Sequence, residues 1–123
     1  EVEVASDRRM ALMREFEQPH APSVHELLAE LDPCADWVLV EGFKDCDLPK
    51  IEIWRTPTPD YRERPVRYPH DPCIVAVATD AAQLPVPTLL PLLDLGAPHA
   101  VVQWLLAQGA RFDYSNQTVE ACE

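Results

Sequence analysis

The chain has 123 residues, which is the length of a single domain. Its 10 Lys and Arg residues against 21 Asp and Glu residues give a formal net charge of −11, which opposes attraction to nucleic acid or to an anionic membrane surface. No apolar run is long enough to span a bilayer, and the N-terminal EVEVASDRR lacks the layout of a secretory signal. The sequence therefore predicts a soluble, cytoplasmic protein with no nucleic-acid or membrane partner.

Glycine and proline are used in unusual proportions, with only 3 Gly but 13 Pro residues. Few positions therefore allow the backbone to approach a phosphate closely. Neither GxxxxGK[ST] nor GxGxxG occurs in the sequence. The chain begins without an initiator Met, and we expect a segment upstream of the first residue.

The first thirty residues show an opening hairpin followed by a short helix. Two short apolar stretches, Val2–Ala5 and Met10–Phe16, flank the polar SDRR, a pattern typical of two antiparallel strands joined by a turn. Ser23 and Glu26 have the spacing of a capping box. They predict a helix over residues 24–31, which ends before a proline.

Two apolar runs without alternation predict strands that are covered on both faces. The first is Trp37–Val40, which ends at Glu41, and the second is Cys73–Ala78, which ends at Thr79 and Asp80. We expect the first of these strands to be central and parallel in the sheet. Each run is thus followed by a carboxylate.

The segment between these runs holds six prolines, which exclude a long crossover helix. Only residues 50–55, KIEIWR, alternate as a strand does. Six of the ten basic residues of the chain also lie here: Lys44, Lys50, Arg55, Arg62, Arg64 and Arg67. Two interpretations stay open, namely a surface that binds an anion and simple neutralisation of the five neighbouring acidic residues.

The C-terminal third predicts a short strand and a helix. Leu89–Asp94 reads as a strand that Pro91 places at an edge or a strand start. The helix begins at Pro98, carries apolar residues at helical spacing, and is followed by Gly109. We assign residues 1–110 to one domain and residues 111–123 to a polar, loose tail.

The acidic residues that follow the predicted strands are candidate ligand groups. Ligands of open α/β sheets collect at the carboxyl ends of the strands. Glu41 is placed to hold Mg²⁺, and Asp80 is placed to accept the N1–H and exocyclic amine of a guanine edge. Carboxylates at strand ends also cap helices and turns, and this alternative stays open for both residues.

An ordered set of motifs gives the chain a resemblance to a known family. The set consists of VASDRRMALM, DWVLVEGFK, KIEIWR, VAVATD and LLDL, followed by a helix with VVQWLLAQ. In this order and spacing it resembles the C-terminal part of the molybdopterin-guanine dinucleotide biosynthesis protein B (MobB) family, over roughly residues 2–108.

The resemblance implies a fold, ligands and partners. The family has an α/β, P-loop-NTPase-like fold with a mixed sheet and flanking helices, binds GTP with Mg²⁺, and is dimeric. It assists the nucleotidyltransferase that joins GMP to molybdopterin. By this resemblance Glu41 ends the Walker B strand, Thr79 and Asp80 lie on the guanine side, and the loop that begins at Asp94 flanks the base. From the clustering of basic charge, and not from the resemblance, we expect Lys44, Arg55, Arg62, Arg64 and Arg67 to form a surface that binds phosphate or pterin anions.

The sequence departs from the family in one large respect. No residues match the first strand, the Walker A loop and its helix, so the P-loop lysine and the Mg²⁺-binding Ser or Thr have no counterpart here. We therefore expect no hydrolysis by this chain alone, and an exposed sheet edge that an upstream segment or a second copy covers. Two alternative functions stay open: a protein-interaction module that binds no nucleotide, and another synthetase of the P-loop class.

Overall fold

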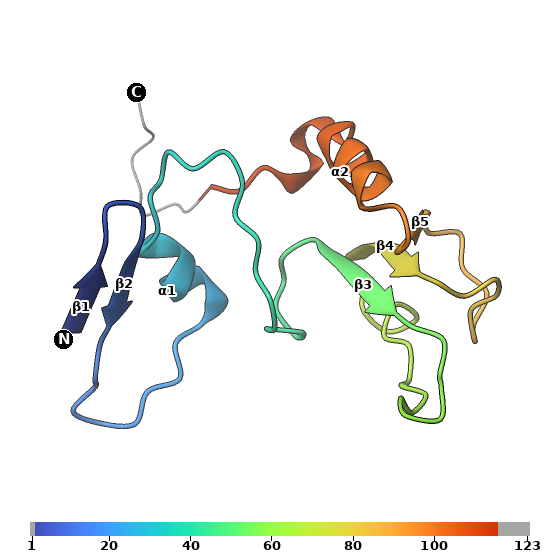
Figure 1. Cartoon of the computed structure of the whole chain (residues 1–123), viewed down its shortest axis with the longest axis horizontal. Coiled ribbons are helices and arrows are strands. Elements are labelled where there is room, and N and C mark those ends of the chain that lie inside the picture. Colours follow the sequence, from blue (N-terminus) through green and yellow to red (C-terminus); the bar gives the residue numbers. More distant parts are fainter. Residues whose placement is uncertain (1, 116–123) are drawn as a thin grey trace. The chain divides into compact units, whose positions relative to one another are not determined.

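The structure is a computed structural model that describes residues 2–115 (Figure 1). The described part of the chain forms two compact units. The N-terminal unit holds residues 2–43, and the sheet unit holds residues 44–115.

The N-terminal unit opens with the predicted hairpin, which the structure confirms. Strand β1 (Val2–Ala5) pairs in antiparallel register with β2 (Met10–Met13). The Ser6 hydroxyl accepts hydrogen bonds from the backbone N–H groups of Arg8 and Arg9, at 3.4 and 3.2 Å, and so holds the turn. Because side chains alternate along a strand, Val4, Ala11 and Met13 share one face of the hairpin.

Helix α1 (Val24–Ala29) begins where the capping box predicts. The Ser23 hydroxyl accepts from the Glu26 N–H at 3.2 Å, and the Glu26 carboxylate accepts from the Ser23 N–H at 3.1 Å. The helix ends at Ala29 rather than at Leu31, because the chain tightens there into a bond from the Leu31 N–H to the Leu28 carbonyl.

The predicted strand at Trp37–Val40 is wrong. These residues adopt no strand or helix, and their side chains are exposed, from 39% at Val40 to 84% at Leu39. A strand needs a neighbouring strand to satisfy its backbone groups, and no strand pairs with this segment within residues 2–115. The apolar composition of this segment predicts a buried strand. Such a strand needs a partner strand, and residues 2–115 contain none that pairs with it.

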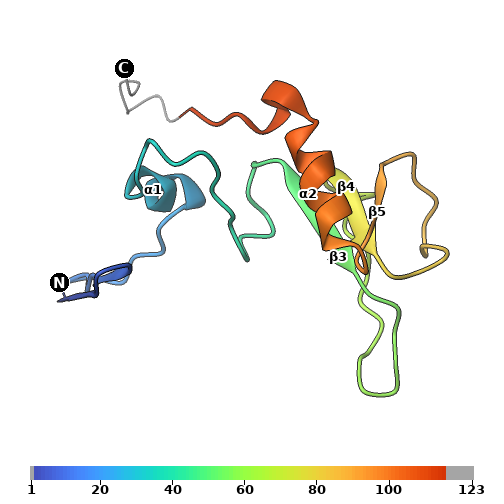
Figure 2. The same cartoon turned by 45° about the horizontal axis from the view of Figure 1, so that its top comes forward.

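The sheet unit is built on three parallel strands (Figures 1 and 2). Strand β3 (Lys50–Trp54) pairs with β4 (Ile74–Thr79), which in turn pairs with β5 (Leu92–Asp94). The predicted strands over 50–55, 73–78 and 89–94 are thereby confirmed, with β5 beginning just after Pro91. This mixed α/β architecture is compatible with a P-loop-like fold.

Strand β4 is covered on both faces, as its continuous apolar run predicts. On one face Val77 packs with Trp54 and Tyr68. On the other face Ala76 and Ala78 pack with residues of β5 and α2. Two small cores therefore meet at β4, which is the most buried strand of the unit.

Helix α2 (Pro98–Leu106) begins at the predicted proline and lies over one face of the sheet (Figure 2). A 3₁₀ helix, η1 (Gly109–Phe112), follows and brings the Phe112 ring edge-on to Trp104, with ring centroids 6.0 Å apart. None of the helices in the described range is long and apolar enough to cross a membrane. Of the predicted tail, residues 116–123 lie outside the described residues, and the domain assignment stays a prediction.

Removal of the Val77 methyl groups tests the two-sided burial of β4. Val77 is fully buried at 0% exposure, so Val77→Ala should lower the free energy of unfolding by about 2 kcal/mol through lost burial and a residual cavity. Val102→Ala, at a position of α2 that is 51% exposed, is the matched control and should change it by less than about 0.5 kcal/mol. Urea denaturation measures both values, and equal effects would contradict the packing described here.

Candidate functional site

The carboxyl ends of the three parallel strands meet at one edge of the sheet. Trp54 lies beside Thr79 in the β3–β4 register, and Thr79 lies beside Asp94 in the β4–β5 register. Asp80 follows Thr79 directly. The structure thus brings together Thr79, Asp80 and Asp94 at the edge where open α/β sheets bind ligands.

Two of these side chains hold the loops that leave the strands. The buried Thr79 hydroxyl accepts a hydrogen bond from the Ala81 N–H at 3.0 Å. The Asp94 carboxylate accepts from the Gly96 N–H at 2.7 Å. Both are local turns in which a side chain replaces a backbone acceptor. The turns set the direction in which each loop leaves the sheet edge.

Asp80 is linked to the end of the neighbouring strand. Its Oδ1 atom accepts hydrogen bonds from the Thr56 N–H at 2.7 Å and from the Thr56 hydroxyl at 3.0 Å. These bonds, chiefly the one from the backbone N–H, hold the pKa of Asp80 below its usual value, and the charge of Arg55 acts in the same direction. The carboxylate is therefore ionised, exposed and fixed at one oxygen.

Glu41 belongs to the N-terminal unit, whereas Thr79, Asp80 and Asp94 belong to the sheet unit. It is exposed and follows the segment that forms no strand. No group of three or more His, Cys, Asp or Glu residues that could hold a metal ion occurs among the described residues. The metal role of Glu41 stays a prediction.

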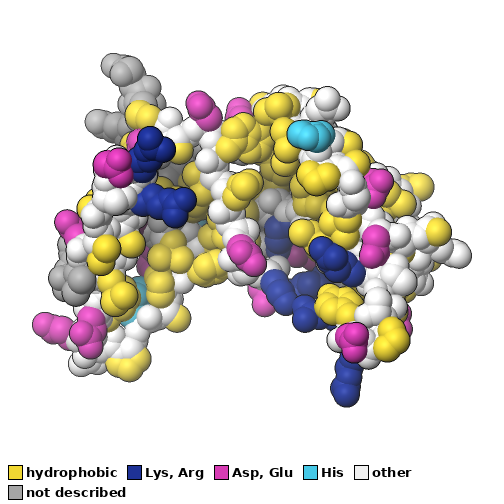
Figure 3. Space-filling view, in the orientation of Figure 1, with side chains coloured by type: hydrophobic (Ala, Val, Ile, Leu, Met, Phe, Trp, Pro, Cys, Tyr) yellow, Lys and Arg dark blue, Asp and Glu magenta, His cyan; other side chains and the backbone are white. Residues whose placement is uncertain are grey.

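The basic residues gather around β3 and the loop that follows it (Figure 3). Arg67 forms an ion pair with Asp45. For this basic residue, the structure therefore favours neutralisation by a neighbouring acidic residue. The Arg64 guanidinium lies over the Tyr61 ring, 5.4 Å from its centroid. Lys44, Arg55 and Arg62 are exposed. The anion-binding alternative therefore rests on these three exposed side chains.

Lys50 anchors the start of β3. Its Nζ atom donates to the Asp71 carboxylate at 2.5 Å and to the Lys44 carbonyl at 2.8 Å. The hydrogen bond from Lys50 is the main cause that lowers the pKa of Asp71. Both side chains are largely buried, with 17% and 18% exposed, so the pair ties the loop before β4 to β3.

Sequence reasoning missed the contacts that secure the proline-rich loop. Glu52 accepts from the Arg67 N–H at 2.6 Å and from the Tyr68 N–H at 2.9 Å. The Tyr68 hydroxyl donates to the Val86 carbonyl. The only sequence signal for these contacts is the position of the Glu52 carboxylate in the middle of a strand. That signal does not indicate which residues, distant in sequence, donate to it.

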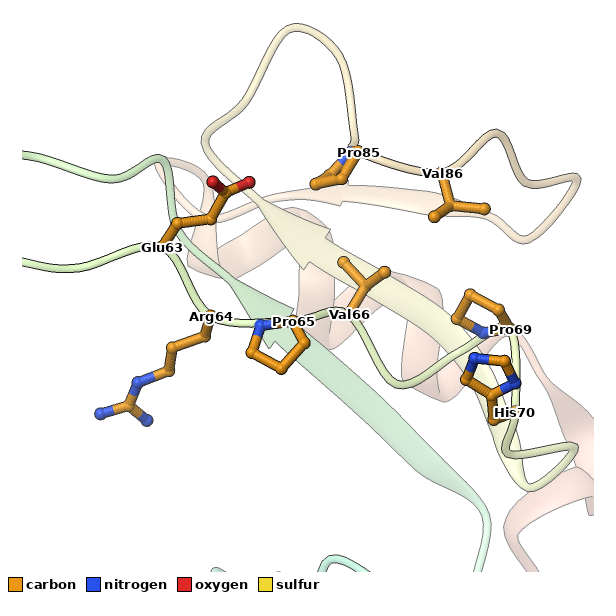
Figure 4. A pocket seen from close by; sticks show the side chains of 8 residues that line it. All are labelled: Glu63, Arg64, Pro65, Val66, Pro69, His70, Pro85 and Val86. Carbon is orange, nitrogen blue, oxygen red and sulfur yellow. The ribbon is translucent and has the colours of Figure 1, made fainter.

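The same loop lines a shallow groove (Figure 4). Pro85 and Val86 form one side, and the other side is formed by Pro65, Val66 and Pro69. His70 lies at one end, and the Arg64 side chain points away from the opening (Figure 4). The lining is mainly apolar and does not include Thr79, Asp80 or Asp94.

Comparison with known proteins identifies the family. Residues 1–80 match the family described as "Molybdopterin guanine dinucleotide synthesis protein B". The chain is also 33% identical over 110 residues to the "Molybdopterin-guanine dinucleotide biosynthesis adapter protein" of Escherichia coli, strain K12. The chain belongs to this family, and the resemblance drawn from its motifs is confirmed. No solved structure matches the chain.

The extent of the match differs between the two proteins. The alignment covers 85% of this chain but 59% of the E. coli protein. The chain therefore spans less than two thirds of the relative that it matches.

Acid should weaken the sheet unit through Asp71 and Asp80. Both carboxyls have pKa values below the ordinary 3.8, so the unfolded chain binds protons more readily than the folded chain. Their contribution is complete well above pH 3.8 and is lost as the pH falls through the lowered pKa values of the folded state. The melting temperature, followed by circular dichroism from about pH 6 to about pH 2.5, should fall less steeply in the double variant Asp71→Asn/Asp80→Asn. Parallel curves for the two proteins would contradict this account.

Proposed function

We propose that this chain acts as an adapter in the biosynthesis of molybdopterin guanine dinucleotide. Its membership of the protein B family carries the proposal, because the family match spans residues 1–80 and the E. coli relative is named as an adapter of this pathway. As an adapter it assists the nucleotidyltransferase that attaches GMP to molybdopterin.

The carboxyl edge of the sheet supplies the guanine side of a nucleotide site. Asp80 accepts the N1–H and exocyclic amine of guanine, while Thr79 and Asp94 shape the loops on either side of the base. Support comes from the shared register of Thr79 and Asp94 and from the exposed, ionised carboxylate of Asp80. A carboxylate has about four acceptor positions; Thr56 uses two of them and the Asp80 N–H also bonds to this carboxylate, so the guanine donors share the acceptor capacity that remains.

The phosphate side of that site requires groups other than Thr79, Asp80 and Asp94. The 123 residues contain no GxxxxGK[ST] motif, and such a loop supplies the backbone N–H groups and lysine that hold nucleotide phosphates. Binding of GTP with Mg²⁺, with Glu41 as the acidic residue on the metal side, therefore needs a phosphate-binding segment from outside these residues. We expect the chain to contact the base but not to hydrolyse GTP.

We also propose that the exposed basic residues bind an anionic molecule. Lys44, Arg55 and Arg62 offer positive charge for the phosphate of a nucleotide or a pterin. Arg55 immediately follows β3, whose end is bonded to Asp80 through Thr56. Arg64 and Arg67 contribute less, since one lies over Tyr61 and the other is paired with Asp45.

Titration with GMP tests the guanine side directly. Amide resonances of residues 79–81 and 94–96 should shift on addition of GMP, with a Kd on the order of 1 mM because the phosphate cradle is missing. AMP, which lacks the donor pair, is the ligand control. Asp80→Asn should weaken GMP about tenfold and favour XMP, because the amide donates to the C2 carbonyl of xanthine where the carboxylate accepts from guanine.

The same titration separates the possible outcomes. Equal shifts with GMP and AMP, or an unchanged GMP affinity in Asp80→Asn, would remove the base-reading role of Asp80. Calorimetry with Mg·GTP then decides between the adapter with a nucleotide site and an interaction module that has no ligand of its own.

The exposed apolar side chains of the N-terminal unit favour that second candidate, a protein-interaction module. Val4, Met10, Met13 and Leu39 are between 66% and 84% exposed. A hairpin of two strands is marginally stable alone, and exposed apolar faces of this kind mark contact surfaces. On this reading the hairpin forms a homodimer contact or docks the nucleotidyltransferase.

A charge placed on the hairpin tests the dimer contact. We expect the wild-type chain to be dimeric in size-exclusion chromatography with light scattering, and Met13→Asp to shift it toward monomer because a carboxylate would be desolvated in the contact. Leu106→Asp, on α2 and 63% exposed, is the matched control and should leave the mass unchanged. A monomeric wild type, or the same effect from both variants, would argue against this contact.

A further inference from the structure

Thr56 joins the end of β3 to the residue that follows β4. Its backbone N–H and its hydroxyl both donate to Oδ1 of Asp80, at 2.7 and 3.0 Å. The two residues are 24 positions apart in the chain, so the contact arises only when the parallel strands place their carboxyl ends together. No motif in the sequence marks Thr56.

The position of Thr56 in the chain suits it to hold a fixed geometry. It precedes Pro57, and a residue before proline is restricted to extended conformations. On its other side, Trp54 is buried in the core and donates from Nε1 to the Arg64 carbonyl at 2.8 Å. Thr56 is therefore held from both directions, although it is exposed, as Asp80 is.

An exposed aspartate without partners rotates among several side-chain conformations. Two donors that converge on one oxygen select a single orientation of the carboxylate, because both must be satisfied at the same time. The two hydrogen bonds from Thr56 both fall on Oδ1, so that orientation also fixes where Oδ2 points. The backbone N–H of Asp80 also bonds to this carboxylate. The pKa of Asp80 is lowered mainly by the Thr56 N–H, which keeps the acceptor charged.

We propose that Thr56 is a positioning residue that orients the Asp80 carboxylate and so sets the discrimination between guanine and other 6-oxopurines. This inference rests on the proposed guanine-side function of Asp80. Guanine and hypoxanthine share N1–H, but only guanine has the exocyclic amine. A correctly oriented carboxylate gains from the second donor, whereas a rotating one meets the two donors together only part of the time.

The experiment compares GMP with IMP on the full chain. In the wild type, NMR titration should give a GMP affinity about tenfold higher than that for IMP. Thr56→Val keeps the branched shape and the backbone N–H but removes the hydroxyl, and it should reduce the GMP-to-IMP ratio to about threefold or less. Thr56→Ser restores the hydroxyl and should recover most of the ratio.

A matched control lies two residues further along the chain. Thr58 also precedes a proline, and its described hydrogen bonds join its backbone to that of Tyr61. Thr58→Val makes the same chemical change in the same loop and should leave the GMP-to-IMP ratio unchanged.

A second measurement needs no nucleotide. The ¹³C resonance of the Asp80 carboxyl reports its pKa, which should rise in Thr56→Val and not in Thr58→Val, because one hydrogen bond that favours the charged form is lost. An unchanged Asp80 pKa in Thr56→Val would overturn the orienting contact itself.

The outcomes distinguish this inference from the function on which it rests. If the wild type prefers GMP and Thr56→Val keeps or increases that preference, Thr56 does not position Asp80 and the guanine-side function stands. If the wild type binds GMP and IMP equally, or binds neither, the guanine-side function falls and the recognition role of Thr56 falls with it.

Discussion

Burial of β4 on both faces is the constraint on which the sheet unit depends. The strand places Val77 against Trp54 and Tyr68 on one side, and Ala76 and Ala78 against α2 and β5 on the other. A strand held in this way has one permitted register, since a shift by one residue would exchange its two faces. The same register fixes the position at which β4 ends, and therefore where Asp80 leaves the sheet.

The proline-rich loop shows how the unit covers one face of its sheet without a helix. Prolines exclude a helix there, so the loop must be secured by separate contacts. Glu52 binds two backbone N–H groups of the loop, Trp54 binds a carbonyl, and the Tyr68 hydroxyl reaches a second loop. Such contacts satisfy the polar groups of an irregular segment that packs on a core. The aromatic rings of Trp54 and Tyr68 then supply the buried area.

The sequence predicted the elements whose signals are local. The capping box at Ser23 and Glu26 places the start of α1, and the uninterrupted apolar run from Cys73 identifies a strand covered on both sides. The strand predicted at Trp37–Val40 is wrong, because a strand there needs a partner strand, and the composition of the segment does not show whether one is present. The grouping of Thr79, Asp80 and Asp94 was predictable, since the ends of parallel strands share an edge. The Thr56 contact was not, because it joins residues that only the folded register brings together.

In the proposed function, the residues at the carboxyl ends of the strands recognise a base, and other groups bind the phosphates of the nucleotide. Phosphates contribute much of the binding free energy of a nucleotide through helix N-termini and lysine, and they do not distinguish one base from another. Base edges contribute less but carry the selectivity, because an unmatched buried donor or acceptor is costly. In the proposed function Asp80 selects the base, and the phosphate-binding groups that retain a nucleotide come from outside these 123 residues. We propose that such contact is selective but weak, which suits the proposed adapter role because an adapter passes the nucleotide on to the enzyme that uses it.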